Sequence, residues 1–471
     1  MSRNEWDEQD FERYAEWELE APALPPRSQL YPLEPMGMGT PEVEGLTSYL
    51  TRLAGAHHVS TGDLLGNVLT PHFAKPSWVR HGSPNLGTLY SGAGALNGVG
   101  SQASEWVQVL ETLTLRTDLR ALTLLVWAEA LPAKELLRPT RAWCPTCYHE
   151  WRTRGQVIYE PLLWTLGVVT ACARHRWRLR AQCPASACQR SIPWLASHAR
   201  PGYCPSCQEW LGETKTHRPT KQERLSEEET AWQSWVAQAV GELLAHNGAL
   251  SKPPQRERVT KTLFDCIQQV TNGKKTTFAR LLGLNWEKFR TWARGTAIPV
   301  FPELLQLCYR LGSTPLAFLT AEEMVIDLDR LVRPTEPEWL TRQLRPPRKR
   351  LRPETLRQDL QAIITAQEEL PPSLQEVAQR LGHSVPALRR NCPDLCEALV
   401  RRYTVYIQAQ KQQRLETRAK EIREAVLSLQ SAGVYPSQER VAALLARPAF
   451  FLDPEARDVW HQVLDELGFS L

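Results

Sequence analysis

The sequence predicts a mainly α-helical, multidomain protein, and three observations lead to this fold class. The chain has 471 residues, which corresponds to about three domains at 100–200 residues per domain. Proline is abundant (35) and glycine scarce (25), which favours short helices separated by proline-bounded turns over glycine-rich strands. Hydrophobic residues make up 42% of the chain and include 17 tryptophans, enough to fill several small cores.

Charge and cysteine content restrict the class of protein further. The chain as a whole is nearly balanced in charge, with 56 Lys and Arg against 52 Asp and Glu. Any affinity for nucleic acid must therefore come from basic residues concentrated in particular segments. No charged-then-apolar leader opens the chain, and its longest apolar run, Ala121 to Ala128, is too short to span a membrane. We therefore expect a cytoplasmic protein with reduced cysteines. Seven of the eleven cysteines lie between Cys144 and Cys207.

The first segment, residues 1–30, is expected to be an acidic mobile tail. Eight acidic residues precede residue 21, and the proline-rich stretch that follows cannot help to close a core. One interpretation is a solvated arm. The other is a short motif that binds a basic partner surface through its aromatic residues, Trp6, Phe11, Tyr14 and Trp17.

Residues 31–140 predict an N-terminal helical, helix-turn-helix-like domain. Apolar residues recur every three or four positions from Thr40, with Pro41 and Glu42 in the expected first turn. A short helix is expected at 62–69, and a longer helical region at 106–131.

Residues 141–212 have the ligand spacing of a double zinc-binding domain. Two closely spaced pairs of cysteines, or of a cysteine and a histidine, can close one tetrahedral shell, and the eight ligands divide into two such sets. Four residues separate Cys183 from Cys188, and two residues separate the members of each of the other three pairs. The ligands are Cys144, Cys147, Cys172 and His175, then Cys183, Cys188, Cys204 and Cys207. All four positions of each shell are filled, so we expect two structural Zn²⁺ ions per chain.

Two other interpretations of these cysteines are weaker. Redox chemistry would need a thioredoxin-like βαβ unit, which the segment does not show, and inert cysteines would not need this spacing. Six tryptophans punctuate the segment and are expected to pack around the knuckles rather than stack on bases: Trp143, Trp151, Trp164, Trp177, Trp194 and Trp210.

Residues 213–333 predict a helical domain that contains a helix-turn-helix. Ser226 and Glu229 form a capping box that starts its first helix, and a bundle of short helices is expected at 259–319. The run from Phe278 to Asn285 is typical of a helix, a tight turn at Gly283 and a cap. The outward candidates for DNA contact on the second helix are Trp286, Glu287, Lys288, Arg290, Thr291 and Arg294. The same pattern could also be a simple packing unit.

Residues 334–353 are expected to be a basic linker, because arginines alternate there with prolines. The linker is either a solvated tether or, if both of its neighbours bind DNA, a phosphate contact through Arg348, Lys349 and Arg350.

The C-terminal part repeats itself, which predicts one helix-turn-helix repeat at 354–412 and a second, helix-turn-helix-like, at 413–471. The segment 372–381 resembles 436–445 at a constant offset of 64. In the first repeat Ser384 is the expected cap, with Arg389 and Arg390 on the following helix. DNA contact by the second repeat stays open. The predicted architecture is thus a helical N-terminal domain, two zinc knuckle or ribbon modules, and tandem helix-turn-helix domains.

These motifs resemble the TniQ/TnsD family of transposon target-site selectors. The resemblance is carried by 143–151, 159–164, Cys172-x-x-His175, Cys183-Pro184, 201–204, and the helix motif at 46–54. It implies a bacterial, non-enzymatic protein that marks the insertion site, either by binding double-stranded DNA at an attachment site directly or as an adapter. It also implies recruitment of a TnsC-like AAA+ regulator, which in turn brings the transposase.

Three alternatives accompany this resemblance. A TniQ-type adapter would bind a CRISPR RNA-guided effector instead of reading DNA directly, although the extended helical array favours the direct reader. A zinc-containing transcription factor would share the DNA-binding features but need no ATPase partner. An enzyme is disfavoured, because no Walker loop, HExxH or nucleophile motif occurs.

Overall fold

The computed structural model describes most of the chain. The described residues are 27–74, 78–80, 83–186, 188–214, 224–250, 252–332, 353–366, 371–381, 383–445, 451 and 454–469. Within these ranges the chain is mainly helical, as the sequence predicts. No helix in the described part is both long enough and apolar enough to cross a bilayer.

The N-terminal part consists of short helices and one two-stranded antiparallel pair. Its helices are α2 (Leu46–Ala56), α3 (Thr61–Asp63), η1 (Leu64–Leu69), η2 (Thr70–His72), α4 (Leu86–Gly92), η3 (Ala93–Asn97), α5 (Ser101–Thr114), η4 (Leu119–Leu122) and η5 (Leu125–Trp127). The strands are β1 (Val79–Arg80) and β2 (Ser83–Pro84). The predicted short helix at 62–69 is present as α3 continued by η1.

One predicted helix start in this part is wrong, and one predicted helical region is divided; each difference has a physical reason. The first helix begins at Leu46 rather than Thr40, because Glu44 pairs with Pro161 and the Gly45 amide bonds to the Glu160 carbonyl. The helical region predicted at 106–131 is present but divided into α5, η4 and η5, because α5 ends where Leu115 adopts a left-handed conformation. Tertiary pairing and a single backbone turn therefore override the apolar periodicity.

The middle of the chain combines a cysteine-rich segment with a helical bundle. The cysteine-rich segment contains α6 (Pro145–Thr153), η6 (Leu162–Thr165) and several isolated β-bridges. The bundle contains α7 (Glu227–Ala245), α8 (Arg256–Thr271), α9 (Lys275–Leu281), α10 (Trp286–Trp292), α11 (Phe301–Arg310), α12 (Pro315–Thr320) and η8 (Leu328–Arg330). The predicted capping box of Ser226 and Glu229 starts α7.

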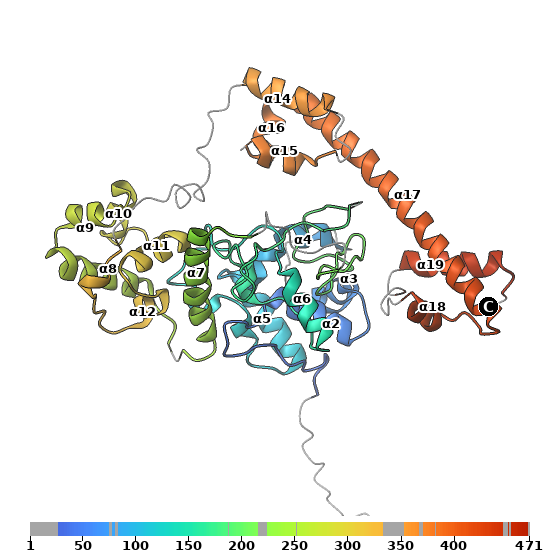
Figure 1. Cartoon of the computed structure of the whole chain (residues 1–471), viewed down its shortest axis with the longest axis horizontal. Helices are drawn as coiled ribbons and strands as arrows, with labels where there is room; N and C mark the ends of the chain where they lie inside the picture. Colours follow the sequence, from blue (N-terminus) through green and yellow to red (C-terminus); the bar gives the residue numbers. More distant parts are fainter. Residues whose placement is uncertain are drawn as a thin grey trace, which may run out of the picture.

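One continuous hydrophobic core joins the N-terminal helices to this bundle. Its buried residues run from Leu30 to Ile326, and Asn247 after α7 accepts a hydrogen bond from the indole of Trp127. A separate cluster of buried hydrophobic residues lies within the cysteine-rich segment. Figure 1 shows α7 lying between the N-terminal helices and the bundle of α8 to α12.

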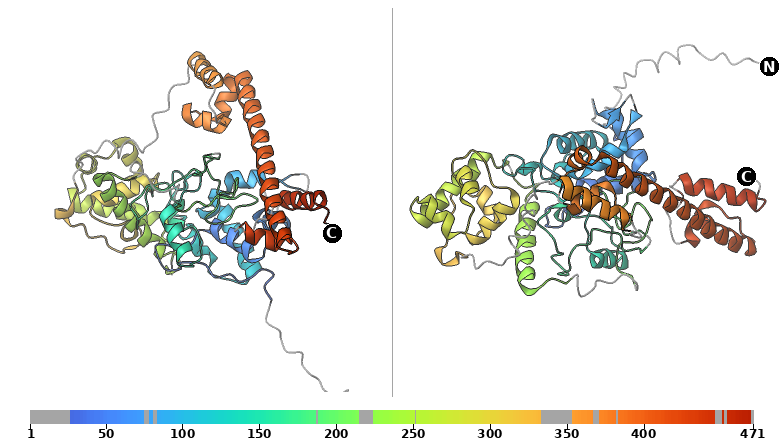
Figure 2. Two further views of the ribbon diagram at one scale, coloured as in Figure 1. Left: turned by 45° about the vertical axis from the view of Figure 1, so that its right-hand side comes forward. Right: turned by 90° about the horizontal axis from the view of Figure 1, so that it is seen from above.

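The C-terminal part consists of two small modules built on one long helix. Its helices are α14 (Pro353–Thr365), α15 (Leu374–Leu381), α16 (Val385–Asn391), α17 (Pro393–Ser431), α18 (Gln438–Leu444) and α19 (Pro454–Glu466). Figures 1 and 2 show α14, α15 and α16 at one end of α17, and α18 and α19 at the other. Each end has its own core.

The two modules repeat the same core positions. Val377 and Ala378 of α15 are buried as are Val441 and Ala442 of α18, 64 residues later. Residues at the start of α17 are buried in the first core, and residues near its end are buried in the second. A helix of 39 residues, about 58 Å long at 1.5 Å per residue, thus belongs to both modules.

Candidate metal centres and nucleic-acid interface

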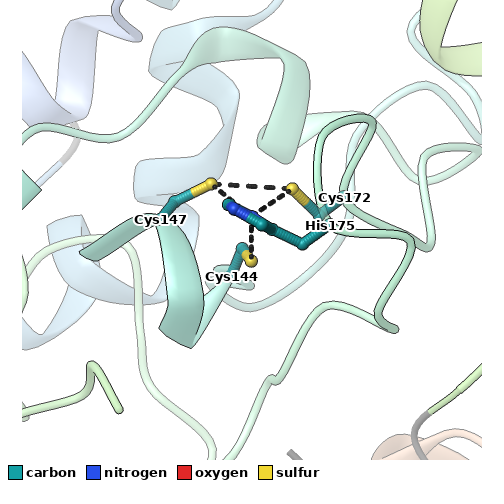
Figure 3. Close-up of side chains that lie close together, drawn as sticks. All are labelled: Cys144, Cys147, Cys172 and His175. Carbon is teal, nitrogen blue, oxygen red and sulfur yellow. Dashed lines mark hydrogen bonds between the residues drawn. The ribbon is translucent and has the colours of Figure 1, made fainter. Parts of the chain in front are cut away.

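The first cysteine cluster forms where α6 meets a tight turn. Cys144 precedes α6 as its N-cap residue, and Cys147 lies in the first helical turn. Cys172 and His175 lie on a turn in which the Arg176 amide bonds to the Cys172 carbonyl and Arg176 is left-handed. Figure 3 shows the four side chains converging from these two segments.

The spacing within this cluster fits a tetrahedral ion. The His175 Nδ1 atom lies 3.4 Å from the Cys144 Sγ, 3.3 Å from the Cys147 Sγ and 3.5 Å from the Cys172 Sγ. The sulfurs of Cys147 and Cys172 are 3.6 Å apart. Zinc bonds of about 2.0–2.3 Å put tetrahedral ligand atoms about 3.5–3.8 Å apart. Three sulfurs and one nitrogen can therefore hold one metal ion.

A carboxylate orients the histidine from outside the cluster. The Nε2 atom of His175 lies 3.0 Å from a Glu150 oxygen, which leaves Nδ1 to face the sulfurs. Arg174 donates to the other Glu150 oxygen at 2.8 Å. The hydrogen bond with His175 is the largest cause that lowers the pKa of Glu150. Such a partner selects the histidine tautomer and supports metal binding.

The second cluster contains four cysteines and no histidine. The sulfurs of Cys183 and Cys207 are 3.5 Å apart, and those of Cys188 and Cys204 are 3.8 Å apart. The four sulfurs lie within 4.8 Å of one another. These distances also fit a tetrahedral ion, and both quartets are the ones that the spacing predicts.

Aromatic residues pack around both clusters. Five of the six tryptophans predicted to pack are buried, and Trp177 is half-buried. Trp151 stacks on Tyr159 at 4.9 Å between ring centroids, and Trp164 meets Tyr148 edge-on. This packing leaves the described tryptophans of the segment little surface for base stacking.

A buried ion pair lies beside α6, the helix that carries Cys147. Arg141, which precedes α6, donates to Glu160, and both side chains are almost fully buried. The Tyr148 hydroxyl donates to the same Glu160 oxygen at 3.3 Å. Burial is the largest effect on the pKa of Glu160 and raises it.

The second cluster faces the middle of α17. A cleft of about 230 Å³ lies between them, lined by Cys188, Arg190 and Cys207 on one side and by Gln410, Thr417 and Arg418 on the other. The long helix therefore runs past the cysteine cluster on its way from the first C-terminal module to the second.

The predicted helix-turn-helix forms from α9 and α10. Gly283 is left-handed in the turn, and Asn285 caps α10 by accepting from the Lys288 amide at 3.1 Å. Phe289 and Trp292 are buried, as predicted for the inward face. Arg310 of α11 fastens the turn by donating to the carbonyls of Leu282 and Gly283.

The outward face of α10 carries the predicted DNA-contact residues, and two of its cations are paired with acids. Lys288 donates to Glu303 of α11, and Arg290 donates to Glu287 at 2.9 Å. Trp286 and Arg294 are exposed. Thr291 donates to the Lys288 carbonyl at 2.7 Å. The surrounding segment 252–294 carries ten Lys and Arg against three Asp and Glu, which makes this region locally basic.

The remaining predicted residues divide into two groups. Ser384 caps α16 through the Ala387 amide, and Arg389 and Arg390 are exposed on that helix. The other group lies outside the described residues and comprises Trp6, Phe11, Tyr14, Trp17, Arg348, Lys349 and Arg350.

Sequence reasoning missed two residues beside these sites. Glu150 follows Cys147 by three residues on the same helix, so helical spacing could have placed it next to the cluster. Glu303 lies 15 residues from Lys288 on another helix, and no local pattern links them.

Comparison with known proteins supports one family. A sequence model of the TniQ family matches residues 35–179. The match covers α2 to α6 and all four residues of the first cluster, and it ends before the second cluster begins. No curated protein matches the chain.

Proposed function

We propose that this chain, whose residues 35–179 match the TniQ family model, is a target selector in transposition. We further propose that it reads an attachment site directly. In this role the chain binds double-stranded DNA, recruits an AAA+ regulator and so brings in the transposase. The TniQ match is the observation that carries the proposal. The role is non-catalytic.

The helical array after the cysteine-rich segment supports direct reading over an adapter role. A capped helix-turn-helix in α9 and α10 lies in a segment rich in Lys and Arg, and α16 exposes Arg389 and Arg390. A second helix of this kind can enter the major groove, with phosphate contacts from the basic residues beside it. We propose that residues from about 257 onward supply most of the sequence-specific affinity.

The two cysteine clusters are proposed to hold structural zinc. Thiolate and imidazole ligands at these distances suit Zn²⁺, and each set is complete with four ligands. Zinc bound there would cross-link α6 to the turn at Cys172 and would close the second knuckle. Metal analysis of the purified protein should return two equivalents of zinc. A well-folded protein with none would contradict this assignment.

The proposed function is tested by selecting bound fragments from sheared bacterial genomic DNA on the immobilised full chain. Direct reading predicts enrichment of one genomic position by the protein alone. Enrichment that appears only when a guide RNA and its effector are added would favour the adapter, and no enrichment in either case would contradict both. Lys288→Ala should lower affinity for the selected site more than for random duplex.

Recruitment of the regulator is proposed to involve residues 1–140. The acidic residues around Trp6, Phe11, Tyr14 and Trp17 suit a positively charged protein surface better than phosphates. Deletion of residues 1–22 should reduce capture of the AAA+ regulator in a DNA-tethered pull-down and leave DNA binding intact. If the shortened protein still captures the regulator, the tail is not the recruiting segment. If the intact chain captures no regulator, the result would favour a transcription factor without an ATPase partner.

A further inference from the structure

The side chain of Lys288 is held by an acid from the neighbouring helix. Its Nζ atom donates to the Oε1 atom of Glu303, in the first turn of α11. Glu303 is only 9% exposed, whereas the Lys288 side chain is 52% exposed. One end of the pair is therefore fixed inside the domain, and the other lies on the outward face of α10.

Both partners are fastened by further hydrogen bonds. The other Glu303 oxygen accepts from the Val300 amide at 3.3 Å, which ties the carboxylate to the start of α11. Asn285 accepts from the Lys288 amide, and Thr291 donates to the Lys288 carbonyl. The position of the ammonium group is thus set from α10 and α11 together.

This pairing changes what Lys288 can do on DNA. Moving its ammonium to a phosphate would leave a nearly buried carboxylate without its cation, which is unfavourable. The neutralised pair also displaces no condensed counterion from the duplex. The ammonium has three N–H donors and Glu303 uses one of them. The remaining donors suit the O6 and N7 acceptors of guanine in the major groove.

We propose that Glu303 is a positioning residue, which keeps Lys288 as a base-reading hydrogen-bond donor and prevents it from acting as a phosphate-binding cation. This inference rests on the proposed reading of DNA by α10. Arg290 on the same helix differs, because its acidic partner Glu287 is exposed and lies on the same surface turn. An exposed pair of that kind is weak and leaves the arginine free to contact phosphate.

The first test measures salt dependence on a random-sequence duplex of about 40 base pairs, for which no target need be known. Glu303→Gln keeps an oxygen acceptor but frees the charge of Lys288. The logarithmic slope of affinity against salt should steepen by about 0.9, equal to a further 3.5-fold loss between about 50 and 200 mM salt. The same substitution in a Lys288→Met background should leave the slope unchanged.

Two outcomes of this test would overturn the inference. An unchanged slope in Glu303→Gln would mean that Lys288 is not freed. An equal increase in the Lys288→Met background would mean that Glu303 acts through overall charge. A wild-type chain that binds neither random nor genomic duplex would instead contradict the proposed function.

A second measurement tests the pair without DNA. Thermal unfolding of wild type, Glu303→Gln, Lys288→Met and the double variant should show coupling between the two sites. Additive changes in melting temperature would contradict the pairing. In selection from a random duplex library, wild type should enrich a guanine position that both single variants lose.

Discussion

The two cysteine clusters share one knuckle geometry but differ in what surrounds them. The amides of Cys172 and Cys204 bond to the carbonyls of Trp177 and Glu209, each five residues later. The residue four positions after each cysteine, Arg176 or Gln208, is left-handed. The same backbone turn is therefore built twice within a short stretch of sequence.

Their surroundings separate the two clusters. The first lies inside the TniQ match and includes α6, whose Tyr148 donates to Glu160 of the buried pair with Arg141. The second lies beyond the match and borders a cleft against α17. The first cluster therefore belongs to the segment that the family model matches, whereas the second borders the long helix of the C-terminal array.

The largest effect is expected from Cys144→Ser. Structural zinc contributes about 10–16 kcal/mol in small zinc peptides, which is comparable to the stability of a whole domain. Loss of this ligand should unfold the segment around α6, reduce zinc from two equivalents to one and weaken the near-ultraviolet circular dichroism of its tryptophans. Cys392→Ala, a buried cysteine outside both clusters, should keep both ions. A folded Cys144→Ser protein with two ions would refute the assignment.

Cys207→Ser should have a large but more local effect. The second ion should be lost and the first retained, because the two clusters share no ligand. The middle of α17 should become more sensitive to limited proteolysis, since one wall of its cleft is then unsupported. Loss of both ions would show that the clusters fold as one unit and would remove the proposed difference between them.

Glu160→Gln should lower the stability of the segment around α6 by about 3–5 kcal/mol, because it leaves one partner of a buried ion pair uncompensated. Arg141 would keep its charge with its side chain only 2% exposed. Hydrogen exchange should accelerate in residues 141–160 while zinc stays at two equivalents. Glu129→Gln, at an exposed position, is the matched control. Equal exchange in both variants would show that the pair contributes little.

The smallest effect is expected from Glu150→Gln. Loss of the carboxylate that faces His175 should weaken metal binding at the first cluster by about 10- to 100-fold. Competition with a chromogenic chelator would measure this, with one ion released earlier than in wild type. Glu209→Gln, beside the all-cysteine cluster, should leave both ions unaffected. Early release in both variants would point to a general charge effect.

Local sequence patterns predicted the elements whose causes are themselves local. The caps Ser226, Asn285 and Ser384 each bond an amide three residues ahead, so a short motif is sufficient to predict them. The ligand quartets follow from pairs of cysteines and histidine at knuckle spacing. The periodic helices of the bundle follow from their apolar stripes.

Other features could not be predicted because they depend on contacts between distant segments. The residues expected to form the first turn of the first helix are not helical, because Glu44 instead forms a β-bridge with Pro161. Apolar residues at 106–131 give helical periodicity, but no pattern marks Leu115 as the left-handed residue that ends α5.

The sequence by itself determined the identity of the eight candidate ligands, the helix-turn-helix of α9 and α10, and the repeated C-terminal pattern, because each depends on spacing along the chain. Only the tertiary structure decided which groups meet across elements. It placed Glu303 against Lys288, Glu150 against His175, and the second cluster beside α17. The physical reason is that hydrogen bonds and ion pairs act over a few ångströms, and only folding brings residues of separate helices and turns within that distance.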